Sequence, residues 1–86
     1  MNPELELRVK VLDVWNDVVL RLPPSTPISR LKQLALDAVH ITDDPARFLV
    51  KFRGAELRDE SRSLADERVP ADGALIVMRG HRTPVR

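Results

Sequence analysis

Side chains that could act as nucleophiles or acid–base catalysts are few in this sequence of 86 residues. None of the four serines stands in a segment that resembles a nucleophile elbow: Ser25, Ser29, Ser61 and Ser63. The only histidines are His40, at a predicted helix end where the dipole favours a cation, and His81, near the C-terminus. A ligand or catalytic role is the alternative for His40. We therefore predict that the chain is not an enzyme.

Groups that bind metals or phosphates are also scarce. Asp43 and Asp44 are adjacent carboxylates in a turn-rich segment, where such pairs more often serve as a cap and loop than as metal ligands. The three glycines, Gly54, Gly73 and Gly80, form no phosphate-binding loop. Without cysteines, the chain has neither disulfides nor thiolate ligands. We expect no metal and no other cofactor, and a fold held together by hydrophobic packing.

The charge balance disfavours a polyanionic partner. Lysine and arginine number 14 against 13 acidic residues, so the net charge is only +1. Arginines and acidic residues are interleaved in the C-terminal half, which is typical of a solvated surface with ion pairs rather than a nucleic-acid site. Both phenylalanines are predicted to be buried, which leaves no stacking platform for single strands. Since no apolar run approaches the ~20 residues of a membrane helix and no signal peptide is evident, we expect a cytoplasmic protein without membrane contact.

The first 22 residues predict a β-hairpin. Apolar and polar side chains alternate over residues 5–12, with Arg8 and Lys10 on the polar face. Asn16-Asp17 signals a turn, and the alternation resumes over residues 18–22. The inward residues of this second strand are Val18, Leu20 and Leu22.

A single amphipathic helix is predicted next. Thr26 is a candidate N-cap, and Pro27 suits the first helical position, where its missing N–H costs nothing. The apolar positions fit the helical period: Ile28, Leu31, Leu34, Ala35, Ala38 and Val39. The solvent side is expected to carry Arg30, Lys32, Gln33 and Asp37. The turn-rich residues that follow end the helix near His40.

Three further strands are predicted at residues 48–53, 55–57 and 74–79. Gly54 separates the first two of them, and Asp72-Gly73 turns into the last. The long charged connection between them contains two isolated apolar anchors, Leu64 and Val69. Because a hairpin cannot shield its own apolar face, the helix must pack across the sheet, which gives a two-layer α+β domain. We expect this domain to span residues 1–80 and residues 81–86 to form a flexible tail.

The order of these elements and their residues resemble ubiquitin over about residues 5–80. The most specific match is Phe52-x-Gly54-x-x-Leu57-x-Asp59, which is similar to a ubiquitin segment with one residue inserted. Leu64-x-Asp66-x-x-Val69 follows it. The chain is identified as a divergent member of the ubiquitin-like (β-grasp) family. The resemblance implies a mixed sheet of order 2-1-5-3-4, in which the first and last strands are central.

The C-terminal sequence departs from the conjugated members of that family, which end in Gly-Gly. Two terminal glycines give the slim C-terminus that an activating enzyme adenylates, whereas Thr83 has a side chain and Pro84 fixes its own φ. Gly-Gly occurs nowhere in the chain, and cleavage after Gly80 exposes only one glycine. We therefore expect the chain not to be conjugated as it stands.

The implied strand order brings the outward residues of three strands into one surface. These residues are Arg8 and Lys10, then Leu49, Lys51 and Arg53, then Ile76 and Met78. In ubiquitin this face carries the hydrophobic patch that partners recognise, and here Lys51 takes the place of its central isoleucine and Met78 that of its valine. Trp15 at the hairpin tip adds an aromatic that is costly unless it packs or anchors a partner. We predict a partner-binding face, and the alternative is an ordinary surface with scattered apolar residues.

The predicted function is that of a non-catalytic, monomeric ubiquitin-like module that binds another protein. Relatives without the diglycine include small ubiquitin-like proteins and domains associated with type VII secretion in Gram-positive bacteria, and the Arg- and Ala-rich composition is compatible with a GC-rich bacterium. The chain could equally be a domain of a larger protein. Two alternatives stay open: a small β-grasp subunit of a multicomponent enzyme complex, and a ubiquitin-like modifier with an atypical C-terminus.

Overall fold

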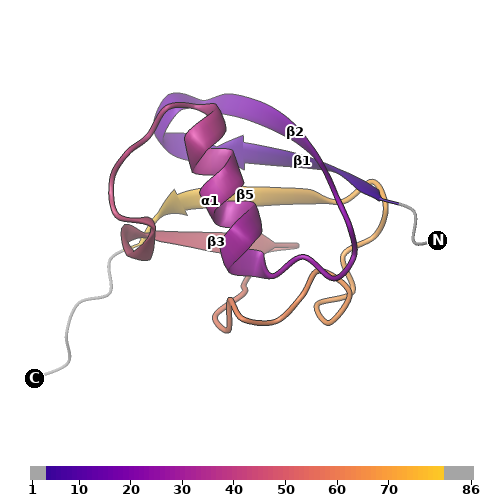
Figure 1. Cartoon of the computed structure of the whole chain (residues 1–86). Helices are drawn as coiled ribbons and strands as arrows, with labels where there is room; N and C mark the ends of the chain where they lie inside the picture. Colours follow the sequence, from indigo (N-terminus) through magenta and orange to yellow (C-terminus); the bar gives the residue numbers. More distant parts are fainter. Residues whose placement is uncertain (1–3, 81–86) are drawn as a thin grey trace, which may run out of the picture.

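The computed structural model describes residues 4–80, which form a five-stranded sheet with one helix packed across it (Figure 1). The elements are β1 (Leu5–Val11), β2 (Asn16–Leu22), α1 (Ile28–Ala38), β3 (Phe48–Phe52), β4 (Ala55–Glu56) and β5 (Ala74–Arg79). The sheet order is β2-β1-β5-β3-β4, with β1 and β5 parallel and the other neighbouring strands antiparallel. The predicted α+β architecture and strand order are confirmed.

The turn between β1 and β2 lies earlier than the sequence predicted. A short 3-10 helix, η1 (Leu12–Val14), follows β1, and Trp15 then adopts a left-handed backbone with φ of 50°. Its N–H donates to the carbonyl of Leu12 at 3.2 Å. Asn16 already pairs with Val11 as the first residue of β2. The predicted turn at Asn16-Asp17 is therefore wrong, because the chain has reversed before it reaches these residues.

The helix α1 buries four apolar side chains completely: Ile28, Leu31, Ala35 and Leu36. Leu36 is missing from the predicted apolar face, whereas Leu34 is only half-buried and Ala38 is exposed. The buried stripe is thus turned toward Lys32 and Leu36. The helix ends at Ala38, and His40 takes the left-handed conformation (φ 61°) soon after it, close to the predicted end.

The start of α1 is capped by backbone carbonyls rather than by a side chain. The helix begins at Ile28, the preceding Pro27 provides no cap, and the predicted N-cap at Thr26 is wrong. Instead, the N–H of Ile28 donates to the carbonyl of Arg62, and that of Ser29 to the carbonyl of Glu60, both at 2.9 Å. The connection between β4 and β5 therefore satisfies the free donors at the start of the helix.

Lys32 is the clearest departure from the predicted solvent side of the helix. It is only 4% exposed. Its ammonium donates to the carbonyl of Phe48 at 3.0 Å and lies 2.7 Å from a carboxylate oxygen of Glu60. Because both partners come from outside the helix, helical periodicity alone places Lys32 on the wrong side.

The core lies between α1 and the inner face of the sheet. Alternate residues of β1, β3 and β5 are buried, but the inward residues of β2 are only half-buried. Phe52 is half-buried as well, so the prediction that both phenylalanines are buried holds for Phe48 alone. Three side chains from the β4–β5 connection close the core: Leu57, Leu64 and Val69. The Leu57 N–H also donates to the carbonyl of Val50 at 2.8 Å. These anchors hold a long irregular segment against the domain.

A two-residue turn joins β3 to β4. Arg53 and Gly54 both have positive φ, 54° and 82°, as in the hairpin turns that match the twist of antiparallel strands. A side chain at Gly54 would meet no atom within 4 Å, so the backbone conformation is the reason for glycine there.

No helix within residues 4–80 is long and apolar enough to span a membrane. The predicted flexible tail, residues 81–86, lies outside the described residues, as does His81. The domain boundary at residue 80 therefore stays a prediction.

Candidate functional site

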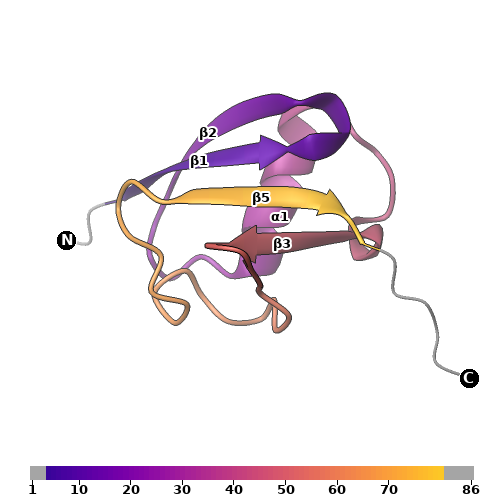
Figure 2. The ribbon, with the colours of Figure 1, turned by 180° about the vertical axis from the view of Figure 1, so that it is seen from behind.

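The sheet has one face covered by α1 and one face turned away from it, which Figure 2 presents without a helix in front of it. We call the second the outer sheet face. The residues in the strands that alternate with the buried core positions define it: Glu6, Arg8, Lys10, Asp17, Val19, Arg21, Leu49, Lys51, Glu56, Ala74, Ile76 and Met78. These side chains stand in rows across the strands, since residues paired across a ladder project to the same side.

The middle row of the outer sheet face has Ile76 at its centre. Ile76 pairs with Lys10 on β1 and with Lys51 on β3, and its side chain is 37% exposed. The Lys10 ammonium lies 3.4 Å from a carboxylate oxygen of Asp17 on β2. The structure thus brings three of the predicted site residues together as an apolar side chain between two lysines.

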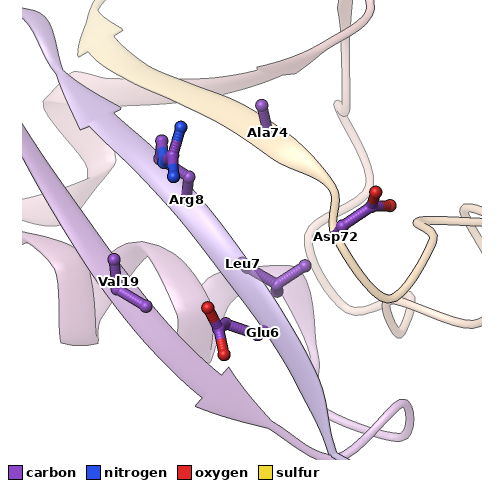
Figure 3. A pocket seen from close by; sticks show the side chains of 6 residues that line it. All are labelled: Glu6, Leu7, Arg8, Val19, Asp72 and Ala74. Atoms are coloured by element: carbon purple, nitrogen blue, oxygen red, sulfur yellow. The ribbon is translucent and has the colours of Figure 1, made fainter.

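The neighbouring row consists of Val19, Arg8 and Ala74 and is hollowed (Figure 3). The hollow has a volume of about 280 Å³, and Glu6 and Asp72 border it. Val19 is 55% exposed. The small side chain of Ala74 leaves room beside the longer Arg8, which explains why the surface sinks at this point.

A third row lies near the end of β5 and is more buried. Leu49 and Met78 face each other across β3 and β5, and both are half-buried. A side chain added at Gly80 would come within 2.4 Å of Leu49, so the chain passes directly against this leucine. Of the three predicted apolar residues, Ile76 is therefore the most accessible.

Trp15 extends the outer sheet face at the hairpin tip. Its side chain is 76% exposed, and the Lys10 ammonium lies 5.4 Å from the centre of its ring. This distance suits a cation–π contact. Because Trp15 has a left-handed backbone and its indole packs against so little of the domain, the residue contributes little to the core. This favours the predicted role as an anchor.

Arg79 fixes the hairpin tip to the end of β5. Its guanidinium donates to Asp13 in η1 and to Asp43 before β3, the latter at 2.7 Å, and it lies 4.7 Å from the centre of the Phe48 ring. The hydrogen bonds with Asp43 and then Asp13 raise the pKa of Arg79 above its ordinary value. The position of Trp15 is thus tied to the central strand.

Arg53 lies at the margin of this surface. It belongs to the turn after β3, and its guanidinium is 5.0 Å from the ring centre of Phe52, a side chain that packs against the core. Two outward residues that line the hollow, Val19 and Ala74, are missing from the predicted site. Alternation along β2 could have identified Val19, whereas the exposure of Ala74 depends on the register between β1 and β5.

The carboxylates elsewhere have structural partners. Asp44 accepts from the N–H of Ala46 at 2.9 Å at the start of η2 (Pro45–Arg47), so the adjacent Asp43 and Asp44 serve different contacts. Hydrogen bonds from Ser61 lower the pKa of Asp59, and those from Ser63 lower the pKa of Asp66. Within residues 4–80 no three His, Cys, Asp or Glu side chains gather as metal ligands would.

The fold is also found among solved structures. The chain is similar to the ubiquitin-like domain of an Arabidopsis thaliana protein, determined by NMR in solution, with a TM-score of 0.71 and 19% sequence identity. The alignment covers 98% of this chain and 85% of that one. No family model and no curated protein sequence matches the chain. The chain has a ubiquitin-like β-grasp fold, as its motifs predicted.

Proposed function

We propose that this chain is a non-catalytic interaction module that binds another protein through the outer sheet face. The observation that carries the proposal is the grouping of exposed apolar residues. Among residues 4–80, four large hydrophobic side chains are exposed, and three of them, Trp15, Val19 and Ile76, lie on or beside this face. Aromatic and apolar anchors that cluster on one surface are typical of protein-binding sites.

The arrangement suits binding because the anchors stand on rigid elements. Ile76 belongs to the central strand β5, and Arg79 ties the tip that carries Trp15 to the same strand. A surface that is already ordered loses less conformational entropy when a partner binds. Positive side chains around Ile76 add selectivity, since charges at an interface exclude wrongly charged partners.

The test is affinity capture from the native host, followed by titration of each captured protein, once purified, against single variants. Ile76→Ala and Trp15→Ala are each expected to weaken binding by about tenfold or more, as truncation of a hot-spot residue does. Arg30→Ala, on the exposed side of α1, is the matched control and is expected to leave the affinity unchanged. If the wild type and the three variants all bind with equal affinity, the partner binds elsewhere.

A further inference from the structure

We infer that the partner presents an acidic segment to the outer sheet face, with an apolar side chain held in the hollow beside Ala74 and a carboxylate paired with Arg8. This inference rests on the proposed function and specifies the chemistry of the partner. It follows from the distribution of charge, from the shape of the surface and from the guanidinium of Arg8, which has no side-chain partner within residues 4–80.

The charge of the chain is nearly balanced, but the centre of the outer sheet face is not. The outward residues of β1, β5 and β3 include three cations, Arg8, Lys10 and Lys51, and one acid, Glu6. Glu6 lies 3.3 Å from Arg21 on β2 and is already paired. The remaining acids, Asp17 and Glu56, stand on the outer strands β2 and β4. Lys10 is likewise paired, with Asp17 at 3.4 Å. The positive charge that the centre offers a partner is therefore chiefly that of Arg8 and Lys51.

Arg8 has no hydrogen bond or ion pair with any side chain of residues 4–80, although it lies at the centre of the sheet. Lys10 and Arg21, on the same surface, do have carboxylate partners, at 3.4 Å and 3.3 Å. A guanidinium offers two parallel N–H donors that match the two oxygens of a carboxylate. Arg8 is thus available for a bidentate pair that the described residues do not supply.

The surface beside Arg8 is concave, and its more apolar part lies toward Ile76. A second hollow of about 250 Å³ adjoins the first and lies between Arg8 and Lys10, with Ala74 and Ile76 along β5 as its apolar lining. Asp17, the partner of Lys10, also lines it. Both hollows share Arg8 and Ala74. Together they offer room for an apolar side chain beside Arg8, whose guanidinium can pair with a neighbouring carboxylate of the partner.

This pattern favours a polypeptide over other anionic partners. A nucleic acid or a lipid surface needs a continuous array of cations, whereas here Ile76 and Ala74 interrupt the cations, and Glu6 and Asp72 border the hollow. A second copy bound through the same face would oppose like charges, which is unfavourable. A polypeptide segment with a carboxylate beside an apolar side chain matches Arg8 and the apolar lining of the second hollow.

The experiment selects peptides from a random ten-residue display library on the immobilised full chain, and then titrates the selected synthetic peptides in solution. The expected result is enrichment of peptides in which Asp or Glu flanks an apolar residue. Arg8→Glu is expected to weaken their binding by about tenfold or more, because it opposes like charges. Arg30→Glu, the same reversal on exposed α1, is the matched control. Higher salt is expected to weaken binding to the wild type.

The outcomes separate this inference from the proposed function. Neutral or basic peptides that lose affinity with Ile76→Ala but not with Arg8→Glu would overturn the acidic partner and leave the binding face in place. Peptides insensitive to both variants would overturn both ideas, and failure to enrich any peptide counts against the acidic segment. A single-stranded oligonucleotide or phosphatidylserine vesicles that bind more tightly than every peptide would also overturn it.

Discussion

Lys32 of α1 and Glu60 of the β4–β5 connection form a largely buried ion pair. The ammonium lies 2.7 Å from one carboxylate oxygen and 2.9 Å from the other, and the two side chains are only 5% and 20% exposed. The same ammonium donates to the carbonyl of Phe48 at 3.0 Å. One side chain thus joins the helix, the start of β3 and the long connection.

The first prediction concerns this pair. Lys32→Met is expected to lower the free energy of unfolding by roughly 3 kcal/mol, since it leaves the Glu60 carboxylate and the Phe48 carbonyl without their buried donor. Urea unfolding measures the loss. Arg21→Met removes the exposed pair with Glu6 and is expected to cost at most about 1 kcal/mol. Similar losses for both variants would contradict the structural importance of Lys32.

The second prediction tests the anchor that follows β4. Leu57 is 7% exposed, and Leu57→Ala is expected to destabilise the fold by roughly 2–5 kcal/mol, through lost burial and an unfilled cavity. Leu49→Ala, on the half-buried outer side of β3, is the control and should cost less. A loss well below about 1 kcal/mol for Leu57→Ala would remove the register proposed from the Phe52–Asp59 motif.

The third prediction separates the stability of Trp15 from its role in binding. A left-handed backbone costs a non-glycine residue roughly 1–2 kcal/mol, while an exposed cation–π contact contributes roughly 0.5–1 kcal/mol. Trp15→Gly removes the cost of the left-handed backbone, but it also removes the cation–π contact and adds flexibility to the unfolded chain. Because these effects oppose each other, we expect the free energy of unfolding to stay within about 1 kcal/mol of the wild type. Partner binding is expected to fall by about tenfold or more. A large loss of stability would instead assign Trp15 a structural role.

The fourth prediction concerns pH. Hydrogen bonds from the backbone and side chain of Ser63 hold the pKa of Asp66 below its ordinary value of 3.8. A carboxyl group with a lowered folded-state pKa stabilises the fold above the unfolded-state pKa, and that stabilisation disappears as the pH falls through the folded-state pKa. Asp66→Asn is therefore expected to lower the urea midpoint at neutral pH, and the difference from the wild type should vanish in acid. A difference that persists below about pH 2 would point to another cause.

The strands could be predicted from the sequence because alternation along a strand is a local property, whereas the order of the strands in the sheet came from the resemblance to ubiquitin. The burial of Lys32 could not be predicted, since its partner Glu60 is 28 residues away and only tertiary packing brings the two side chains together. The start of α1 was misplaced for the same reason, because distant carbonyls replace the side-chain cap expected at Thr26. The outward orientation of the cations could be predicted from alternation. The hollow beside Ala74 could not, because it depends on the register of two strands far apart in the sequence.

The parallel pairing of β1 with β5 bears on how the protein is made. β5 lies between β1 and β3 in the sheet, yet it is the last of these five strands to leave the ribosome. Until then, the hairpin and β3 cannot join into one sheet, and their apolar faces have only α1 to shield them. Pairings between segments far apart in the sequence form slowly, and unpaired strand edges favour aggregation. The nascent chain should therefore depend on chaperones most strongly just before Arg79 emerges.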